Sequence, residues 1–221
     1  MSVRPGPPPR TSEALFPMAY LLVPQFNEPT GFDMPPGRLT DSLEFADPEG
    51  VSWKARLANT DKTKCGYPLR ADTLPSRVTI RGAGAELPDV IAHFVVSGRF
   101  RDLVEAFEPG VHQFVAVDIH TPGKADPLAQ YFWFIVCQRL GAVDEEHTTL
   151  EAGTDQKGGR YWKRARSDQQ LVFSNRKIGD HHIWMTPELL SPNCGFCSAA
   201  FGEAVIQAGF TGVDLFPVAS V

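Results

Sequence analysis

The stretch that decides the fold is SGRFRDLVEAFEPGVHQFVAVDI, which runs from Ser97 to Ile119. Its first half places apolar side chains at the i, i+3, i+4 and i+7 spacing of one helical face, namely Phe100, Leu103, Val104 and Phe107. Ser97 suits the N-cap, because its hydroxyl can accept a hydrogen bond from a first-turn N–H. Pro109 and Gly110 end the helix, and 111–119 is rich in residues that favour strands. The stretch therefore predicts a helix followed at once by a strand, both packed on a core.

A second stretch near the C-terminus repeats this pattern. Ser198 precedes a stripe with the same spacing, Phe201, Ala204, Val205 and Ala208, and a strand is predicted over 213–218. Both stretches contain Ser-x-x-Phe-x-x-x-Val, about a hundred residues apart. An ancient duplication or convergent helix patterning could each produce so short a motif, and its brevity favours convergence.

The region between these stretches supplies further strands. Residues 131–137, YFWFIVC, are apolar at every position, which predicts a central strand covered on both faces. It is expected to form an antiparallel hairpin with 111–119. Residues 170–174 and 181–185 are the next strand candidates, with a turn over 175–180.

These elements predict an α+β fold. We expect a mostly antiparallel sheet of about five strands, packed against two main helices at 98–108 and 198–208. The strands expected in this sheet are 111–119, 131–137, 170–174, 181–185 and 213–218.

Residues 1–86 are irregular and rich in proline and glycine. We expect short strands at 18–23, 51–57 and 77–81 within them. A loop-rich stretch of this length is unusual inside a compact domain. The domain prediction is therefore a loop-rich N-terminal extension or small subdomain over 1–86, and an α+β domain over 87–221 that opens with a short helix at 89–94.

Composition excludes several classes of protein. The net charge of −5 does not indicate a nucleic-acid binder, which would normally show a basic face. No apolar run approaches the ~20 residues that span a bilayer. The N-terminus lacks the apolar region of a secretory signal, and four cysteines are too few for a disulfide scaffold. We therefore expect a cytoplasmic protein with no membrane partner.

One basic run, KGGRYWKRAR over 157–166, interleaves cations with aromatic residues. Such a run can contact RNA or phosphate, although a solvated loop or edge strand is the simpler interpretation. Its aromatic and arginine side chains are also of the kind that anchor protein interfaces. The candidate partner-binding residues are Tyr161, Trp162 and Arg164.

Cys194 and Cys197 form the one motif with evident chemistry, Cys-Gly-Phe-Cys, directly before the second helix. A cysteine at a helix N-terminus has a lowered pKa, which is the basis of redox CxxC sites. However, the βαβ pattern of thioredoxin-like proteins is missing upstream. A zinc site would need two more ligands, and no second CxxC or HxxxH is present. Both cysteines therefore stay redox or zinc candidates, with packing as the simpler role.

Other catalytic patterns are absent or weak. His181 and His182 point to opposite faces of an extended chain and cannot easily bind one metal. His112 and Asp118 lie too far apart along one strand for a dyad, and His120 with Asp126 is a weak acid–base pair. The sequence has neither a Gly-x-Ser-x-Gly elbow nor a phosphate loop. No catalytic residue and no cofactor is predicted.

From about Leu87 to Val218 the chain resembles a family of bacterial immunity proteins of polymorphic-toxin systems, the myxococcal-type immunity domain once catalogued as of unknown function. The landmarks keep their order over roughly 130 residues. They are Leu87-Pro88-Asp89; Val96-Ser97 with Arg101-Asp102-Leu103; Glu105-Ala-Phe-Glu108-Pro109-Gly110 with Gln113-Phe114; and Ala208 to Val213 with Phe216-Pro217-Val218.

The resemblance implies a non-enzymatic cytoplasmic protein that binds and neutralises a cognate toxin by occlusion. It carries over no catalytic residue, and Cys194 and Cys197 are not part of the family pattern. The alternative is a thiol- or zinc-dependent enzyme centred on those two cysteines. The oligomeric state and the toxin are not predicted.

Overall fold

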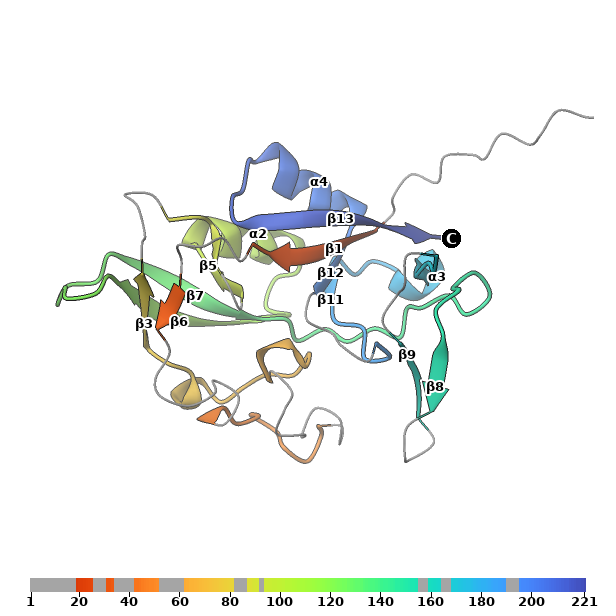
Figure 1. Cartoon of the computed structure of the whole chain (residues 1–221), viewed down its shortest axis with the longest axis horizontal. Helices are drawn as coiled ribbons and strands as arrows, with labels where there is room; N and C mark the ends of the chain where they lie inside the picture. The colour runs from red at the N-terminus through yellow and green to blue at the C-terminus, as the bar shows by residue number, and fades with distance from the viewer. Residues whose placement is uncertain are drawn as a thin grey trace, which may run out of the picture.

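The computed structural model describes residues 19–25, 31–33, 42–51, 62–81, 87–91, 94–154, 159–163, 168–189 and 195–221. Within these ranges the fold is an α+β arrangement dominated by strands (Figure 1). None of the described helices combines the length and the apolar character that crossing a bilayer requires.

The first sheet has six strands in the order β2-β3-β6-β7-β5-β4. Its strands are β2 (Gly31–Asp33), β3 (Arg77–Arg81), β4 (Val90–Ile91), β5 (Val95–Val96), β6 (Gln113–His120) and β7 (Ala129–Ile135). β6 and β7 form the predicted antiparallel hairpin, and β5 pairs with the other edge of β7. β3 runs parallel to β6.

The second sheet has five strands in the order β10-β13-β1-β12-β11. Its strands are β1 (Ala19–Pro24), β10 (Val172–Phe173), β11 (Ile183–Trp184), β12 (Gly195–Ser198) and β13 (Val213–Ser220). The N-terminal strand β1 lies between β12 and β13 and is antiparallel to both. A separate two-stranded ribbon consists of β8 (Ala152–Thr154) and β9 (Arg160–Trp162).

Helices α2 (Gly98–Phe107) and α4 (Ala199–Gln207) lie where the sequence predicted helices. In each helix the N-cap serine, Ser97 or Ser198, accepts a hydrogen bond from the backbone N–H three residues later at 3.2 Å. A four-residue helix, α3 (Asn175–Ile178), occupies most of the turn predicted over 175–180. Two 3-10 turns, η1 (Lys62–Lys64) and η2 (Ala71–Thr73), interrupt the loop-rich segment.

The two sheets contain the same structural unit. In the first unit, β5 and β6 flank the antiparallel β7, with α2 as the crossover between them. In the second unit, β12 and β13 flank the antiparallel β1, with α4 as the crossover. The outer strands also correspond, because β3 and β10 run parallel to β6 and β13, while β4 and β11 run antiparallel to β5 and β12.

The strand registers make this correspondence residue by residue. Ala116 pairs with Phe132, which pairs with Val96, and in the second unit Pro217 pairs with Tyr20, which pairs with Cys197. The paired residues of β5 and β6 therefore lie 101 positions before their counterparts in β12 and β13, as Ser97 does before Ser198. The likeness extends far beyond helix patterning, so the structure favours duplication over the convergence inferred from the motif. β1 takes the place of β7, which means that the second unit is a circularly permuted copy.

The central core joins the two units. Phe100 and Val104 of α2 pack with their counterparts Phe201 and Val205 of α4, between apolar residues from both sheets. The Phe100 and Phe201 rings lie edge to face, with centroids 6.1 Å apart. Equivalent residues in mutual contact are typical of an isologous pair.

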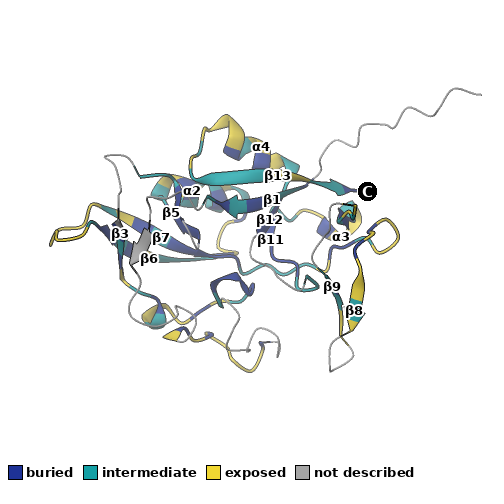
Figure 2. Ribbon diagram, viewed as in Figure 1, coloured by how far each residue is buried: buried dark blue, intermediate teal, exposed yellow. Residues whose placement is uncertain are grey.

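Two further clusters cover the outer faces of the sheets (Figure 2). On the first sheet, side chains from 43–74 cover Trp133 and its neighbours. On the second sheet, Val143, Leu150 and Trp162 pack over Trp184 and Phe196.

Several sequence predictions require correction. The prediction of one sheet holding all five long strands is wrong, because 111–119 and 131–137 belong to one sheet and 170–174, 181–185 and 213–218 to another. The short helix predicted at 89–94 is wrong at Val90–Ile91, which form strand β4. Pro88 and Asp89 suit a helix start, but the β-branched pair that follows pairs with β5 instead.

The expected strands in the N-terminal part are confirmed at 77–81 and, as β1, at 19–24. Most of the strand expected at 51–57 lies outside the described residues. A domain boundary between residues 86 and 87 stays a prediction. β1 and β3, which precede that boundary, pair with strands that follow it.

Candidate partner-binding surface

The ribbon of β8 and β9 carries two of the three predicted partner-binding residues. Trp162 is only 4% exposed and packs in the core of the second sheet, with the Arg160 guanidinium 4.4 Å from the centre of its ring. Tyr161 is half-buried over Gly153, where a Cβ would collide with the tyrosine ring. Arg164 lies outside the described residues. Of this set, Tyr161 has the larger described surface to offer, and its role in binding stays a prediction.

The described cations of the basic run are paired with acidic side chains. Arg160 forms an ion pair with Glu145, and Lys163 Nζ lies 2.8 Å from Glu151 Oε1. Exposed pairs of this kind contribute little to stability, but they cancel the positive potential that an RNA or phosphate ligand would need.

Cys197 is fully buried on β12, where it packs against Leu22 and Phe201 in the central core. Burial raises the pKa of its thiol far above the ordinary value, so the sulfur stays protonated and weakly nucleophilic. Cys194 lies outside the described residues. Among the residues that the structure does describe, no group of three His, Cys, Asp or Glu side chains is placed to hold a metal ion.

The most concentrated polar network centres on Glu108, the C-cap of α2. Its buried carboxylate accepts hydrogen bonds from the backbone N–H groups of His182 and Ile183, both at 2.9 Å, and from His112 Nε2 at 2.8 Å. Burial alone would raise the pKa of Glu108, but the hydrogen bonds from His112 and the two amides outweigh it, and the pKa is lowered.

The network's geometry is structural rather than catalytic. His112 Nδ1 accepts from the Cys137 backbone N–H at 3.3 Å, so Nε2 carries the ring proton and donates it to Glu108. Ser198 Oγ lies 2.9 Å from His182 Nδ1, but Glu108 bonds the backbone of His182 and not its ring. A serine–histidine–acid relay is therefore not formed. Instead, Glu108 ties the end of α2 to the start of β11.

Sequence reasoning missed this network. His112 was compared with Asp118 along one strand, whereas its partner is Glu108 at the end of the preceding helix. The pair is separated by a Pro-Gly turn, and helical spacing offers no guide to a contact across a turn. His120 and Asp126, the weak acid–base pair of the sequence analysis, form no hydrogen bond with each other among the described residues. The His120 imidazole is buried and the Asp126 carboxylate is exposed.

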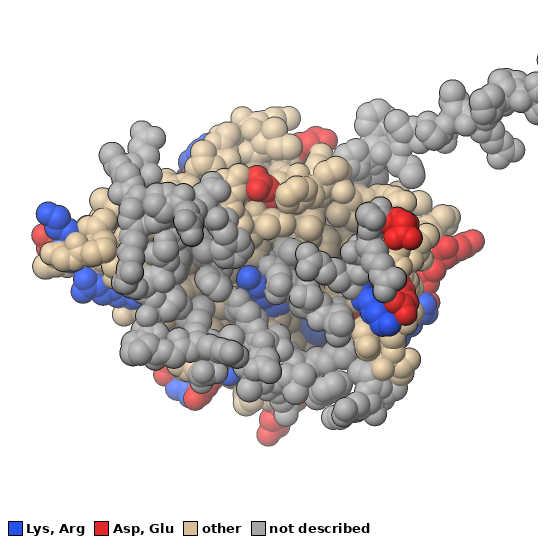
Figure 3. Space-filling view, viewed as in Figure 1, with Lys and Arg blue, Asp and Glu red and all other residues tan. Residues whose placement is uncertain are grey.

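A patch of apolar side chains on the second sheet is the clearest described surface suited to a protein partner. Phe216 of β13 is 51% exposed, and Figure 3 shows a mostly uncharged surface over β13 and α4. Leu215 and Val213 face the helices, so alternation along the strand places Phe216 and Val218 on the opposite face. Leu21, paired with Phe216, and Val23 lie on that same face of β1. We call Leu21, Val23, Phe216 and Val218 the β13 patch.

A known protein family matches most of the chain. The model of a family described as "Immunity protein family (Imm11)" matches residues 73–220 of the 221, from just before β3 to the end of β13. This confirms the resemblance to immunity proteins that the sequence landmarks predicted. A search of curated proteins finds no match to the chain.

Proposed function

We propose that this chain, which belongs to the Imm11 immunity protein family, binds a cognate toxin and neutralises it by occlusion, without a covalent step. The observation that carries the proposal is the family match, which covers all of the first unit's β3–β7 and all of the second unit except β1. We further propose that it acts in the bacterial cytoplasm, within a polymorphic-toxin system, and so protects the cell that makes the toxin.

The chemistry of the described residues supports binding over catalysis. Glu108 joins the two units through its hydrogen bonds to the backbone of His182 and Ile183, and its bond from His112 and the bond between His182 and Ser198 lie within one unit each. The Cys197 thiol is buried and protonated. Occlusion needs neither a tuned base nor a nucleophile, but a rigid scaffold with apolar or arginine anchors and a satisfied polar rim.

The scaffold meets that requirement at α2. Arg99 and Arg101 stack on Phe210 and Phe132, with guanidinium-to-ring distances of 4.1 and 4.4 Å. Such stacking holds long side chains in place before a partner arrives, which reduces the entropy lost on binding. Together with Tyr161, these arginines are the polar part of the proposed interface.

Co-expression with the toxin encoded next to the gene tests the proposal. We expect cells that carry both genes to survive and an affinity-tagged toxin to retain this chain at a 1:1 ratio. The double variant Cys194→Ser, Cys197→Ala, which keeps the buried site apolar, should protect equally well. Loss of protection by this variant, with binding and folding intact, would instead support the thiol- or zinc-dependent enzyme.

A further inference from the structure

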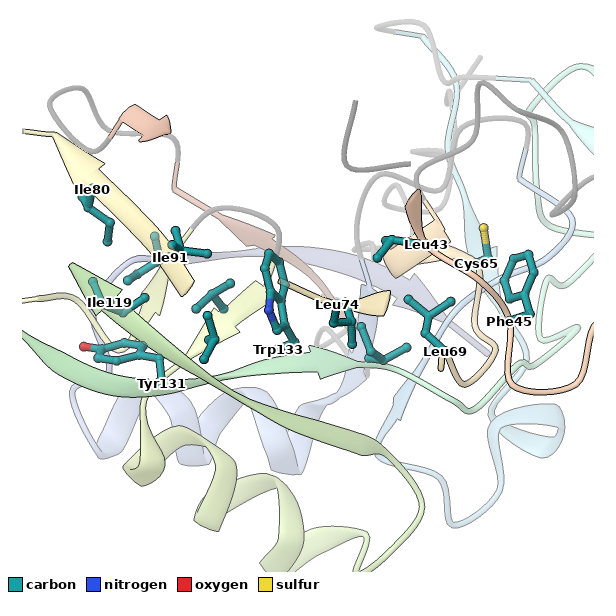
Figure 4. Packing of buried hydrophobic residues seen from close by; sticks show 14 of the residues in the cluster. Leu43, Phe45, Cys65, Leu69, Leu74, Ile80, Ile91, Ile119, Tyr131 and Trp133 are labelled. Carbon is teal, nitrogen blue, oxygen red and sulfur yellow. The ribbon is translucent and has the colours of Figure 1, made fainter. Parts of the chain in front are cut away.

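The internal repeat indicates what the β13 patch accommodates, because its counterpart in the first unit is covered. Leu21, Val23, Phe216 and Val218 correspond by register to Trp133, Ile135, Val115 and Val117. Trp133, Ile135 and Val117 are at most 1% exposed. In Figure 4, side chains of the 43–74 segment lie along the same sheet face, with Leu74 beside Trp133.

Specific hydrogen bonds hold the covering segment in the first unit. The Gln113 side chain accepts from the Leu69 N–H at 2.8 Å and donates to the Leu69 carbonyl at 2.7 Å. Trp133 Nε1 donates to the Pro75 carbonyl at 2.8 Å. The first unit thus shows how this sheet face binds an irregular segment, with apolar side chains on the sheet and an amide that pairs with its backbone.

The described cover of the corresponding face in the second unit is only partial. Leu21 and Val218 pack against the cluster that contains Val143 and Trp162, whereas Phe216 is 51% exposed. In the first unit, the residues before β3 run along β6. In the second unit, the residues before β10 turn toward Thr149 instead, and Gln170 exchanges hydrogen bonds with Thr149. Asp214 takes the place of Gln113. Its Oδ1 accepts from Gln25 Nε2 at 2.5 Å, and its Oδ2 has no hydrogen-bond partner within the described ranges.

We infer that the β13 patch binds an irregular apolar segment of the toxin, with a lysine or arginine of that segment at Asp214. The inference rests on the proposed function. The first unit supplies the form of the occupant, an irregular segment with leucine or phenylalanine side chains. The second unit has the carboxylate of Asp214 where the first unit has the neutral Gln113. An ionised carboxylate only accepts hydrogen bonds and favours a cation, so we expect the bound segment to carry a positive charge there. The net charge of −5 also favours a positively charged partner.

Titration calorimetry with three variants of the full chain tests this inference, and the probe is the neighbouring toxin purified as an inactive variant. Phe216→Ser should weaken binding at least about tenfold, as expected for an interface anchor. Asp214→Asn should weaken binding about threefold and reduce its dependence on salt. Ile206→Ser is the matched control, because Ile206 is 59% exposed on α4, across the sheet from the patch. It should change the affinity less than about twofold.

The outcomes separate the patch from the function. If the wild type and Phe216→Ser bind the toxin equally, the patch inference is overturned and the proposed function stands. If the wild type does not bind the toxin, both are overturned. A concentration-dependent dimer of the chain that Phe216→Ser abolishes would assign the patch to a second copy and overturn the toxin as occupant. Circular dichroism spectra of the variants should match the wild type, because the substituted side chains are at least partly exposed.

Discussion

At the residue scale, Glu108 is a buried side chain that connects the two units directly. It ends α2 of the first unit and accepts two backbone N–H groups at the start of β11 in the second. A buried carboxylate is costly unless its hydrogen bonds are complete, and here three donors satisfy it. Loss of the charge would leave donors unpaired in the core.

Glu108→Gln should therefore lower the free energy of unfolding by about 2–4 kcal/mol at pH 7. Because the folded-state pKa of Glu108 lies below its ordinary value of 4.5, its contribution is complete above that value and is lost as the pH falls through the folded-state pKa. Urea denaturation should show a constant difference in the free energy of unfolding between wild type and variant above about pH 5, and a smaller difference as the pH falls below 4.5. Glu203→Gln, an exposed change on α4, should alter stability little in either range. A difference for Glu108→Gln that does not shrink below pH 4.5 would contradict the assigned role.

At the element scale, each unit relies on a serine cap at the start of its helix and a glycine turn at the end. Gly212, in the turn from α4 to β13, has φ of +81°, and a Cβ there would lie 1.9 Å from the Val90 carbonyl oxygen. Gly209, three residues earlier, also has positive φ, but a Cβ there would meet nothing within 4 Å. Of these two glycines, only Gly212 packs directly against the first unit, at β4.

Gly212→Ala should cost more than about 3 kcal/mol, because backbone strain adds to a collision with main-chain atoms. Gly209→Ala should cost only about 1 kcal/mol, from strain alone. Thermal unfolding of both variants provides the measurement. Equal destabilisation would show that the turn does not pack on β4 as described.

The two caps give a second comparison between the units. Ser97→Ala and Ser198→Ala should each cost about 1–2 kcal/mol, since each removes a bond to a first-turn N–H. Both hydroxyls also reach a second group, Asp89 Oδ1 for Ser97 and His182 Nδ1 for Ser198. Similar losses of denaturation midpoint are expected, and a neutral Ser198→Ala variant would argue against the equivalence of the two caps.

Sequence reasoning located elements where local signals are strong. Helix stripes, serine caps and the alternation around 77–81 depend on neighbours along the chain, and these were found at the expected residues. The pairing of β1 with β12 and β13 joins residues nearly two hundred positions apart, for which no local pattern exists. The division into two sheets was missed for that reason, and so was the Glu108 network, whose two backbone donors, His182 and Ile183, come from the other unit.

At the scale of the whole molecule, the structure is two copies of one unit packed through their helices. The second copy is completed by β1 from the start of the chain, where the first is completed by β7 directly after β6. Ala19 pairs with Val218, so the two ends of the second unit are adjacent.

A circular permutant tests this organisation. The permutant is made by joining Val221 to Met1 and opening the chain after Gln25, so that residues 1–18 connect β13 to β1. In the first unit, residues 121–130 connect the corresponding parts of β6 and β7. We expect the permutant to fold with the circular dichroism of the wild type and a Tm within about 10 °C of it. Opening the chain within β7 instead, after Trp133, should prevent folding, because it cuts a buried central strand. A permutant opened after Gln25 that fails to fold would contradict the repeat.

The stoichiometry with which this chain inhibits the toxin tests the central claim most directly. A fixed concentration of active toxin is titrated with this chain, and the residual activity is measured after short and long incubation. Occlusion predicts that activity falls in proportion to the added chain, reaches zero near a 1:1 ratio and does not change with incubation time. Complete loss of activity at a small fraction of that ratio, growing with time, would show that the chain acts as a catalyst and would contradict the account.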